Sequence, residues 1–464
     1  NSFTLQMIDD MDNRRKFAMN PNIASWAAAA SRWSFYYNML YNVSSAVVNF
    51  SQVAVATYPQ LAGEYGATEA FKMLIKATKL YGSSGLTRKV TDINGEQQDV
   101  RAMLSIENLV NAGKADKYKR LFDVLLNERG MLQNTIVGDI VRGYDQANPL
   151  TRLNIEERVT KYGALLFQQA ERLNREITAV ATFDLEMDKL KGDKDLTQEQ
   201  KEERAIRKAI EVTEFTHGAG HSSTGPSIAQ NSIGKALTVF KRIGFLMYYM
   251  LFDTVRRSMP MANATPEQKE AIRVARRQLI GIYGMAGIFS GVKGMPMYWV
   301  AELLYNTLLA DDDEDDFDAV MRKYLGDLIF KGPVNYFTGL AFADRVGWSD
   351  LLYREPRSTD SSSGMLAQYL ESVLGAPYSV VNNAAKGYDL IRQGQFQRGI
   401  ELMLPVAARN LSKFERYMTE DATTLRGDLV GEINGYNAMM QALGFAPAEL
   451  MNQYDRNANL KRIE

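Results

Sequence analysis

The sequence predicts an all-α protein, built as an extended assembly of many helices. Apolar side chains recur at helical spacing along most of the 464 residues. The hydrophobic fraction of 46% is sufficient to fill a sizeable core. A β signal stands out near 88–101, where Asn94-Gly95 lies between two short segments that hold valine and isoleucine. Because Asn-Gly favours a two-residue hairpin turn, we expect at most one small β-hairpin there.

Three regions are expected along the chain. An N-terminal helical region with the hairpin spans 1–150, a region of long helices spans 151–310, and a C-terminal helical region spans 311–464. In the first region, a polar, mixed lead-in helix is predicted at Ser2–Asn20. Further helices are predicted at Ile23–Leu40, Val43–Tyr58, Gly66–Tyr81, Tyr118–Leu126 and Met131–Tyr144.

The second region opens with the longest predicted helix, Asn154–Leu190. Thr197 and Gln200 have the spacing of a capping box, which starts the next helix and carries it to about Phe215. Thr216–Ser232 is rich in glycine, serine and asparagine, so we expect a loop there.

One helix is expected over Ile233–Arg257, and it is apolar around most of its circumference. Two stripes at helical spacing run along it, through Val239, Ile243, Leu246 and Met250, and through Phe240, Met247, Leu251 and Val255. Such a helix is enclosed by other helices or by lipid. Its longest uncharged run, Ile243–Phe252, is too short to cross a bilayer, which takes ~20 residues. We interpret it as a central core helix; a surface that meets membrane or a second subunit is the alternative.

A further capping box, Thr265 with Gln268, has proline at the first helical position and starts another helix. This helix is basic near its start, where Arg273, Arg276 and Arg277 follow one another at helical spacing. These arginines are candidates for contact with DNA phosphate or an acidic partner. A solvated helix face is the commoner meaning of such a cluster.

Leu279–Ala310 is almost uncharged and carries a glycine pattern. Glycines recur every three or four residues along one helical face, at Gly281, Gly284, Gly287, Gly291 and Gly294. Such a stripe lets another backbone approach closely, and it needs compensating packing because each glycine costs a helix ~1 kcal/mol. With a break at Pro296, we expect a close-packed helical hairpin, either buried or latent for membrane insertion. A bulkier residue in place of Gly287 is then expected to overpack the hairpin.

The third region begins with an acidic run, Asp311–Asp316. It fails the calcium-loop pattern, since Asp316 and Arg322 occupy the positions that need glycine and glutamate. We interpret it as a solvated acidic cap that favours the start of the next helix through the helix dipole. Further helices are predicted at Phe317–Phe330, Met365–Leu374, Tyr378–Arg392, Phe396–Met403, Pro405–Glu420 and Asp428–Leu443.

Composition and motifs point away from catalysis. The chain has no cysteine, which excludes thiolate chemistry and cysteine-ligated metals. Its net charge of −1 gives no bulk attraction to nucleic acid. His217 and His221 have metal-ligand spacing, but the glycines around them indicate polar loop residues. We find no phosphate-binding, nucleophile or zinc motif, and expect no catalytic residue, metal or cofactor. A muramidase-like carboxylate pair stays open among the many acidic residues.

Several blocks, in a fixed order, resemble a family of very large tailed-phage virion proteins. They span roughly residues 38–449, and the central helix resembles the PLxRFG segment of that family. The remaining blocks, which resemble the associated large polyvalent protein domain or a recurring virion block, are Tyr41–Gln52, Leu279–Ala310, Lys331–Val334, Asp344–Gly347 and Leu404–Asn410. The chain keeps only Leu237 and Phe240 of the namesake motif, so no role of its proline, arginine or glycine is carried over.

The resemblance implies a setting. Such regions lie toward the C-terminal end of giant proteins stored inside the phage head and ejected with the genome. Some are similar to the largest internal core protein of T7-like podophages; others extend a virion RNA polymerase. We therefore expect a non-catalytic piece of a longer polypeptide, located inside the capsid and in the host cell envelope during infection. Its expected partners are copies of itself, other internal virion proteins and the portal, phage DNA, and the host membrane after ejection. The alternative is an accessory region of a virion RNA polymerase or a cell-wall-cleaving protein.

Overall fold

The computed structural model describes residues 2–19, 24–85, 87–91, 97–101, 104–132, 162–218, 230–308, 316–349, 351, 374–424 and 427–463. Helices make up most of these residues, so the all-α prediction is confirmed. The expected hairpin is confirmed as β1 (Thr87–Thr91) paired antiparallel with β2 (Gln97–Arg101). Its turn at Asn94-Gly95 lies outside the described residues. A second short pairing that the sequence did not indicate joins β3 (Ala422–Thr423) to β4 (Leu429–Gly431).

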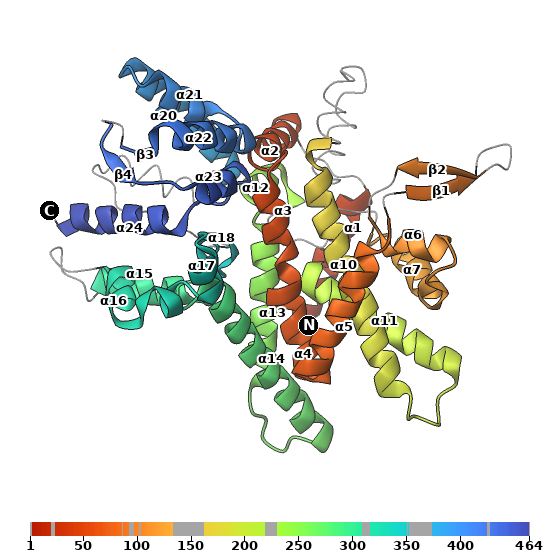
Figure 1. Cartoon of the computed structure of the whole chain (residues 1–464). Helices are drawn as coiled ribbons and strands as arrows, with labels where there is room; N and C mark the ends of the chain where they lie inside the picture. Colours follow the sequence, from red (N-terminus) through yellow and green to blue (C-terminus); the bar gives the residue numbers. More distant parts are fainter. Residues whose placement is uncertain are drawn as a thin grey trace.

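The largest core surrounds one long helix, α10 (Leu165–Leu190). Every side chain from Asn174 to Leu185 is buried, because α10 packs against several helices at once. Figure 1 shows α10 among these helices, with the small helices α6 and α7 at the outer edge. The elements on this side are α3 (Val43–Phe50), the π-helix η1 (Val53–Thr57), α4 (Tyr58–Tyr65), α5 (Ala67–Gly82), α6 (Ile106–Asn111), η2 (Asp116–Tyr118), α7 (Lys119–Asp123), η3 (Val124–Glu128) and α11 (Gln198–His217).

The predicted helix over Ile233–Arg257 is wrong as a single helix. The structure has two helices there, α12 (Ser232–Leu237) and α13 (Arg242–Ser258). Phe240 sits in the left-handed region at φ 68°, which no continuous helix allows. The Thr238 hydroxyl also bonds back to the Gly234 carbonyl at 2.7 Å, a contact that weakens a helix at that point.

A second core lies at the centre of the molecule, where α13 packs along α14 (Pro266–Ser290). It includes Met247 and Leu251 of α13, Ile282 of α14, and the fully buried Trp348. The Tyr248 hydroxyl of α13 donates to the Trp348 carbonyl at 3.0 Å. The interpretation of this segment as a central core helix is therefore correct for Met247, Tyr248 and Leu251, while Tyr249 and Phe252 are exposed.

The predicted helical hairpin over Leu279–Ala310 is not formed. After α14 ends, α15 (Tyr298–Leu308) packs on α16 (Phe317–Phe330) and not back along α14. The cause is a backbone contact at the turn: the N–H groups of Val292 and Lys293 donate to the carbonyls of Ile329 and Phe330 at 3.1 and 3.0 Å. These bonds direct the chain away from α14.

The C-terminal helices form a layer on the far side of α13 and α14, drawn in blue in Figure 1. Asp316 caps α16 by accepting from the Ala319 N–H at 2.7 Å, as expected for the acidic run; Asp311–Asp315 lies outside the described residues. The layer contains α17 (Pro333–Thr338), α18 (Ala343–Val346), α20 (Ala376–Arg392), α21 (Phe396–Met403), α22 (Val406–Glu420), α23 (Gly435–Ala442) and α24 (Ala448–Ile463).

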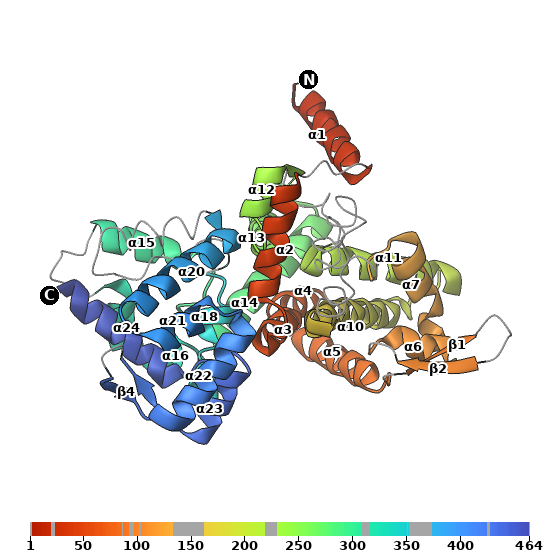
Figure 2. The ribbon, with the colours of Figure 1, turned by 90° about the horizontal axis from the view of Figure 1, so that it is seen from above.

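Two N-terminal helices complete the fold. α2 (Ser25–Asn38) lies beside α12 and α20, and so connects the two sides of the molecule. Figure 2 shows α1 (Ser2–Met19) standing away from the body. The division into 1–150, 151–310 and 311–464 stays a prediction; the largest core combines buried residues from 53–132 with residues from 177–212.

Candidate functional site

The predicted arginines lie on the exposed side of α14, and each has a partner in the chain. Arg273 and Arg277 both pair with Glu270, at 2.7 and 2.8 Å. The Arg276 Nε donates to the Ser258 carbonyl at 3.2 Å. These pairs are solvent-exposed, so each contributes less than ~1 kcal/mol to stability and leaves the guanidinium groups accessible.

The predicted glycines divide between two kinds of environment. An added Cβ at Gly291 would lie 2.3 Å from the Phe330 carbonyl oxygen, and one at Gly281 3.0 Å from Pro59 Cβ. Gly294 similarly lies against Ser290 and the Gly347 backbone. At Gly284, by contrast, no atom of the described residues lies within 4 Å of an added Cβ, and at Gly287 the nearest such atom is Met295 Cε at 3.5 Å. A bulkier residue is therefore expected to overpack the structure at Gly291, and not at Gly287.

The exposed arginines and the uncovered glycines share one face of α14. Residues at three- and four-residue spacing run along it, first basic, then apolar, and Ile280 is 73% exposed. We call this face the α14 stripe; it consists of Arg273, Arg276, Arg277, Ile280, Tyr283, Gly284, Gly287 and Ile288. The opposite side of α14 packs on α4 and α13, so the stripe faces outward.

His217 is not a loop residue, contrary to the sequence interpretation. It is the last residue of α11, and its Nε2 lies 2.8 Å from the Thr57 hydroxyl and 2.9 Å from the Thr178 hydroxyl. Burial lowers the pKa of His217 to about 3, and the nearby Arg175 acts in the same direction. The neutral ring therefore joins η1, α10 and α11; His221 lies outside the described residues.

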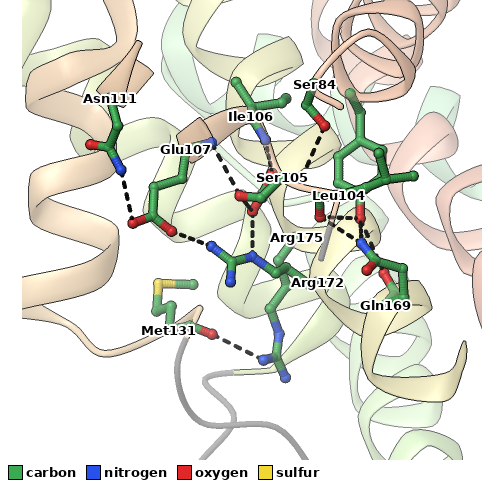
Figure 3. Close-up of polar contacts among 12 residues, drawn as sticks. Ser84, Leu104, Ser105, Ile106, Glu107, Asn111, Met131, Gln169, Arg172 and Arg175 are labelled. Carbon is green, nitrogen blue, oxygen red and sulfur yellow. Dashed lines mark hydrogen bonds and ion pairs between the residues drawn. The ribbon is translucent and has the colours of Figure 1, made fainter. Parts of the chain in front are cut away.

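A buried polar network holds α6 against α10 (Figure 3). Glu176 accepts from the Arg172 Nε at 2.7 Å, the Ser105 hydroxyl at 2.6 Å and the Ile106 N–H at 2.6 Å. Arg172 also pairs with Glu107. Burial raises the pKa of Glu176, against the opposing effect of Arg172 and the two other donors. With every carboxylate oxygen occupied by protein donors, this network has a structural role.

The described part of the chain contains no group of three or more histidine, aspartate or glutamate side chains placed to hold a metal ion. Within the same residues, none of the helices combines the length and apolar character needed to cross a membrane. The described part of Leu279–Ala310 therefore lacks a single helix of the kind that the membrane-insertion alternative would use to span a bilayer.

A cavity of about 990 Å³ lies where the N-terminal helices meet the C-terminal layer. Its described lining comes from α2, α3, α13, α18, α20 and α22 and includes a single carboxylate, Asp344. We call it the basic cavity because of the cationic side chains around it, which are Lys241, Arg242, Arg345, Lys386, Arg409 and Lys413.

Three helices begin at the basic cavity. Residues from the first turns of α13, α20 and α22 line it, and none of these helix starts has a side-chain cap. The residues at the cap positions are Lys241, Gly375 and Pro405, which offer no suitable acceptor. Gly375, at φ 71°, allows the start of α20 to approach the Leu237 carbonyl, from which an added Cβ would be 2.9 Å.

Among the described residues that line the basic cavity, basic side chains outnumber acidic ones. Burial lowers the pKa of Lys241. Burial also lowers the pKa of Lys413, and the guanidinium groups of Arg409 and Arg416 add to this, against the opposing effect of Glu401. Glu401 itself is engaged by Arg416 at 3.1 Å. The cavity is therefore a place where a negative charge would be stabilised.

Sequence reasoning missed the basic cavity. Its cations are scattered singly over 241–413, where each resembles an ordinary surface residue. The one available signal was the lack of Ser, Thr, Asp or Asn caps at three helix starts. No known protein family, curated protein or solved structure matches the chain.

Proposed function

We propose that the chain is the non-catalytic helical region of a phage internal virion protein. In this proposal it assembles with its own copies and with other internal proteins near the portal, and helps form the conduit for genome delivery through the host envelope. The resemblance described above suggests the setting. The single structural observation that supports the proposal is the α14 stripe, a helix face that nothing in the described chain covers.

Gly284 and Gly287 are the informative members of the stripe. Alanine would stabilise an exposed helix position by ~1 kcal/mol over glycine, and at Gly284 the fold leaves open space for it. No packing contact within the described part of the chain therefore requires a glycine at position 284. A second helix whose backbone approaches closely gives such a reason. The exposed Ile280 and Ile288 flank these glycines and supply apolar area for that contact.

The occupant that we propose for the apolar half of the stripe is a second copy of this chain. The basic half, Arg273, Arg276 and Arg277, then lies at the edge of the contact, where it is accessible to phage DNA. After ejection, the apolar half would also be the part available to the host membrane.

Cysteine cross-linking tests the assembly directly, because the natural chain contains no cysteine. Gly284→Cys has space for the new side chain, and we expect it to form a disulfide-linked dimer rapidly under mild oxidation. Gly192→Cys is the matched control, since it also lies in open space but in the turn after α10. Equal cross-linking of the two variants, or a wild-type chain that stays monomeric in light scattering at high concentration, would refute assembly through the stripe.

The virion setting needs its own experiment. Cryo-electron microscopy of the phage particle is expected to place these helices inside the head, above the portal. Density for the chain on the outer surface of the particle, or its absence from purified particles by mass spectrometry, would contradict the setting while leaving self-assembly untouched.

A further inference from the structure

We infer that the basic cavity is a binding site for a phosphate-bearing organic ligand of about nucleotide size. This inference is independent of the proposed assembly, because none of the residues that line the cavity belongs to the α14 stripe.

The first argument is the supply of donors that lack acceptors. Lys386 and Lys413 line the cavity and form no hydrogen bond or ion pair with another described residue. Lys386 is exposed and Lys413 is half-buried. The Nε of Arg409 is buried without an acceptor, although its Nη2 donates to the Tyr37 hydroxyl and the Leu402 carbonyl. A buried donor without a partner opposes folding. A ligand that brings several acceptor oxygens removes that cost.

The second argument is the sign of the charge. Three of the basic side chains that line the cavity, Lys386, Arg409 and Lys413, form no ion pair with another described residue. Asp344, the carboxylate among the described lining residues, also acts on Lys293 outside the cavity, and the nearby Glu401 pairs with Arg416. The positive charge of the three side chains therefore favours an anion.

The third argument is the backbone. α13 and α20 have 17 residues each and α22 has 15, so each carries a full helix dipole. A helix start carries roughly half a positive charge, and its free N–H groups bind phosphate in many proteins. The N-terminal ends of three such helices lie at the same cavity as Lys386 and Lys413. Both features favour a phosphate group.

The lining also sets the shape of the ligand. Besides the cations, the walls carry polar side chains such as Asn42 and Gln441 and apolar ones, among them Ile243, Met247 and the rings of Phe167 and Phe240. The volume of about 990 Å³ is at the upper end of the range for small-molecule sites. A phosphate attached to a flat or apolar group fits both features. Donors that converge from several helices match the three or four oxygens of a phosphate better than the two of a carboxylate.

Calorimetric titration of the purified full chain at low salt tests this site. The probes are inorganic pyrophosphate, ATP without divalent metal, adenosine as the uncharged control, and dihexanoyl phosphatidic acid as a soluble lipid phosphate. Binding of ATP but not of adenosine is expected. Tighter binding of the lipid phosphate than of ATP would identify the lipid as the source of the phosphate, and the reverse order the nucleotide.

Lys413→Met provides the variant. We expect it to weaken phosphate binding about tenfold or more, which is the effect of losing one hydrogen bond to a charged group. Without ligand, the same variant should melt at an equal or higher temperature, because it removes an uncompensated buried charge. Lys72→Met, an exposed lysine paired with Glu69, is the matched control and should bind like the wild type.

Two results would overturn the inference. One is that none of the phosphate probes binds the wild-type chain or raises its melting temperature at millimolar concentration and low salt. The other is that Lys413→Met and Lys72→Met weaken binding equally, since binding would then reflect the general surface charge.

Discussion

Replacing glycines of one helical run by alanine should have opposite effects at positions four residues apart. At Gly291, an added Cβ would lie 2.3 Å from the Phe330 oxygen and 2.4 Å from the Gly332 nitrogen, and φ is +65°. A left-handed conformation costs a non-glycine residue ~1–2 kcal/mol. Moving the facing backbone adds ~1–3 kcal/mol for overpacking. At Gly287, the added Cβ meets only Met295 Cε at an ordinary 3.5 Å.

We therefore expect Gly291→Ala to lower the free energy of unfolding by about 2–5 kcal/mol, which includes weakening of the bonds from Val292 and Lys293 to the facing chain. Gly287→Ala should raise it by ~0.5–1 kcal/mol through helix propensity. Urea unfolding followed by tryptophan fluorescence measures both, because the backbone N–H of Trp348 donates to the Gly294 carbonyl at 2.9 Å and places this tryptophan next to the turn.

Gly332→Ala is the companion variant, since its added Cβ would lie 2.5 Å from the Gly291 nitrogen. It should be destabilised as strongly as Gly291→Ala. A Gly291→Ala protein as stable as the wild type would refute the close backbone approach. A Gly287→Ala protein destabilised by several kcal/mol as a monomer would instead support a facing helix within the chain.

Two further predictions concern the buried polar groups. An unfolded histidine has a pKa of about 6.5 and His217 one of about 3, so between these values only the unfolded chain binds the proton. The free energy of unfolding should therefore fall by ~1.4 kcal/mol per pH unit as the pH drops below 6.5. Urea unfolding at pH 7 and pH 5 should show that His217→Gln loses this part of the pH dependence. An unchanged pH dependence in the variant would contradict the burial of His217. Arg172→Met should cost ~3–5 kcal/mol by leaving the Glu176 carboxylate buried without its cation. The double variant Arg172→Met with Glu176→Gln should recover much of this loss, and a double variant as unstable as the single one would argue against the charge as its cause.

Features that depend on neighbouring residues in the sequence were predicted correctly. Both capping boxes are present, with Gln200 and Gln268 each returning a hydrogen bond to the cap residue. The helix predicted over Gly66–Tyr81 is present as α5, and its residues at helical spacing, Ala70, Leu74, Ala77 and Tyr81, are buried. Such features follow from backbone geometry within one or two turns, so the sequence contains most of the information that they need.

Features that depend on distant neighbours were predicted poorly. The glycines do recur at helical spacing, but their environments depend on the residue at which α14 ends. Gly291 lies beyond the last helical residue and meets the Phe330 backbone, while Gly284 faces solvent. His217 was assigned to a loop on the basis of the glycines after it. Its burial depends on Thr57 and Thr178, which approach only when η1 and α10 pack together.

The basic cavity also depends on residues that are distant in the sequence. Lys241 and Lys413 belong to helices that meet only in the folded chain, and bringing their charges together opposes folding. The free energy that holds them there comes from the apolar packing around α10 and between α13 and α14. A fold that gathers cations and uncapped helix starts at one cavity, with the nearby Glu401 already committed to Arg416, is least strained when an anion occupies it. Ligand binding and stability of the N-terminal to C-terminal junction are thus expected to be coupled.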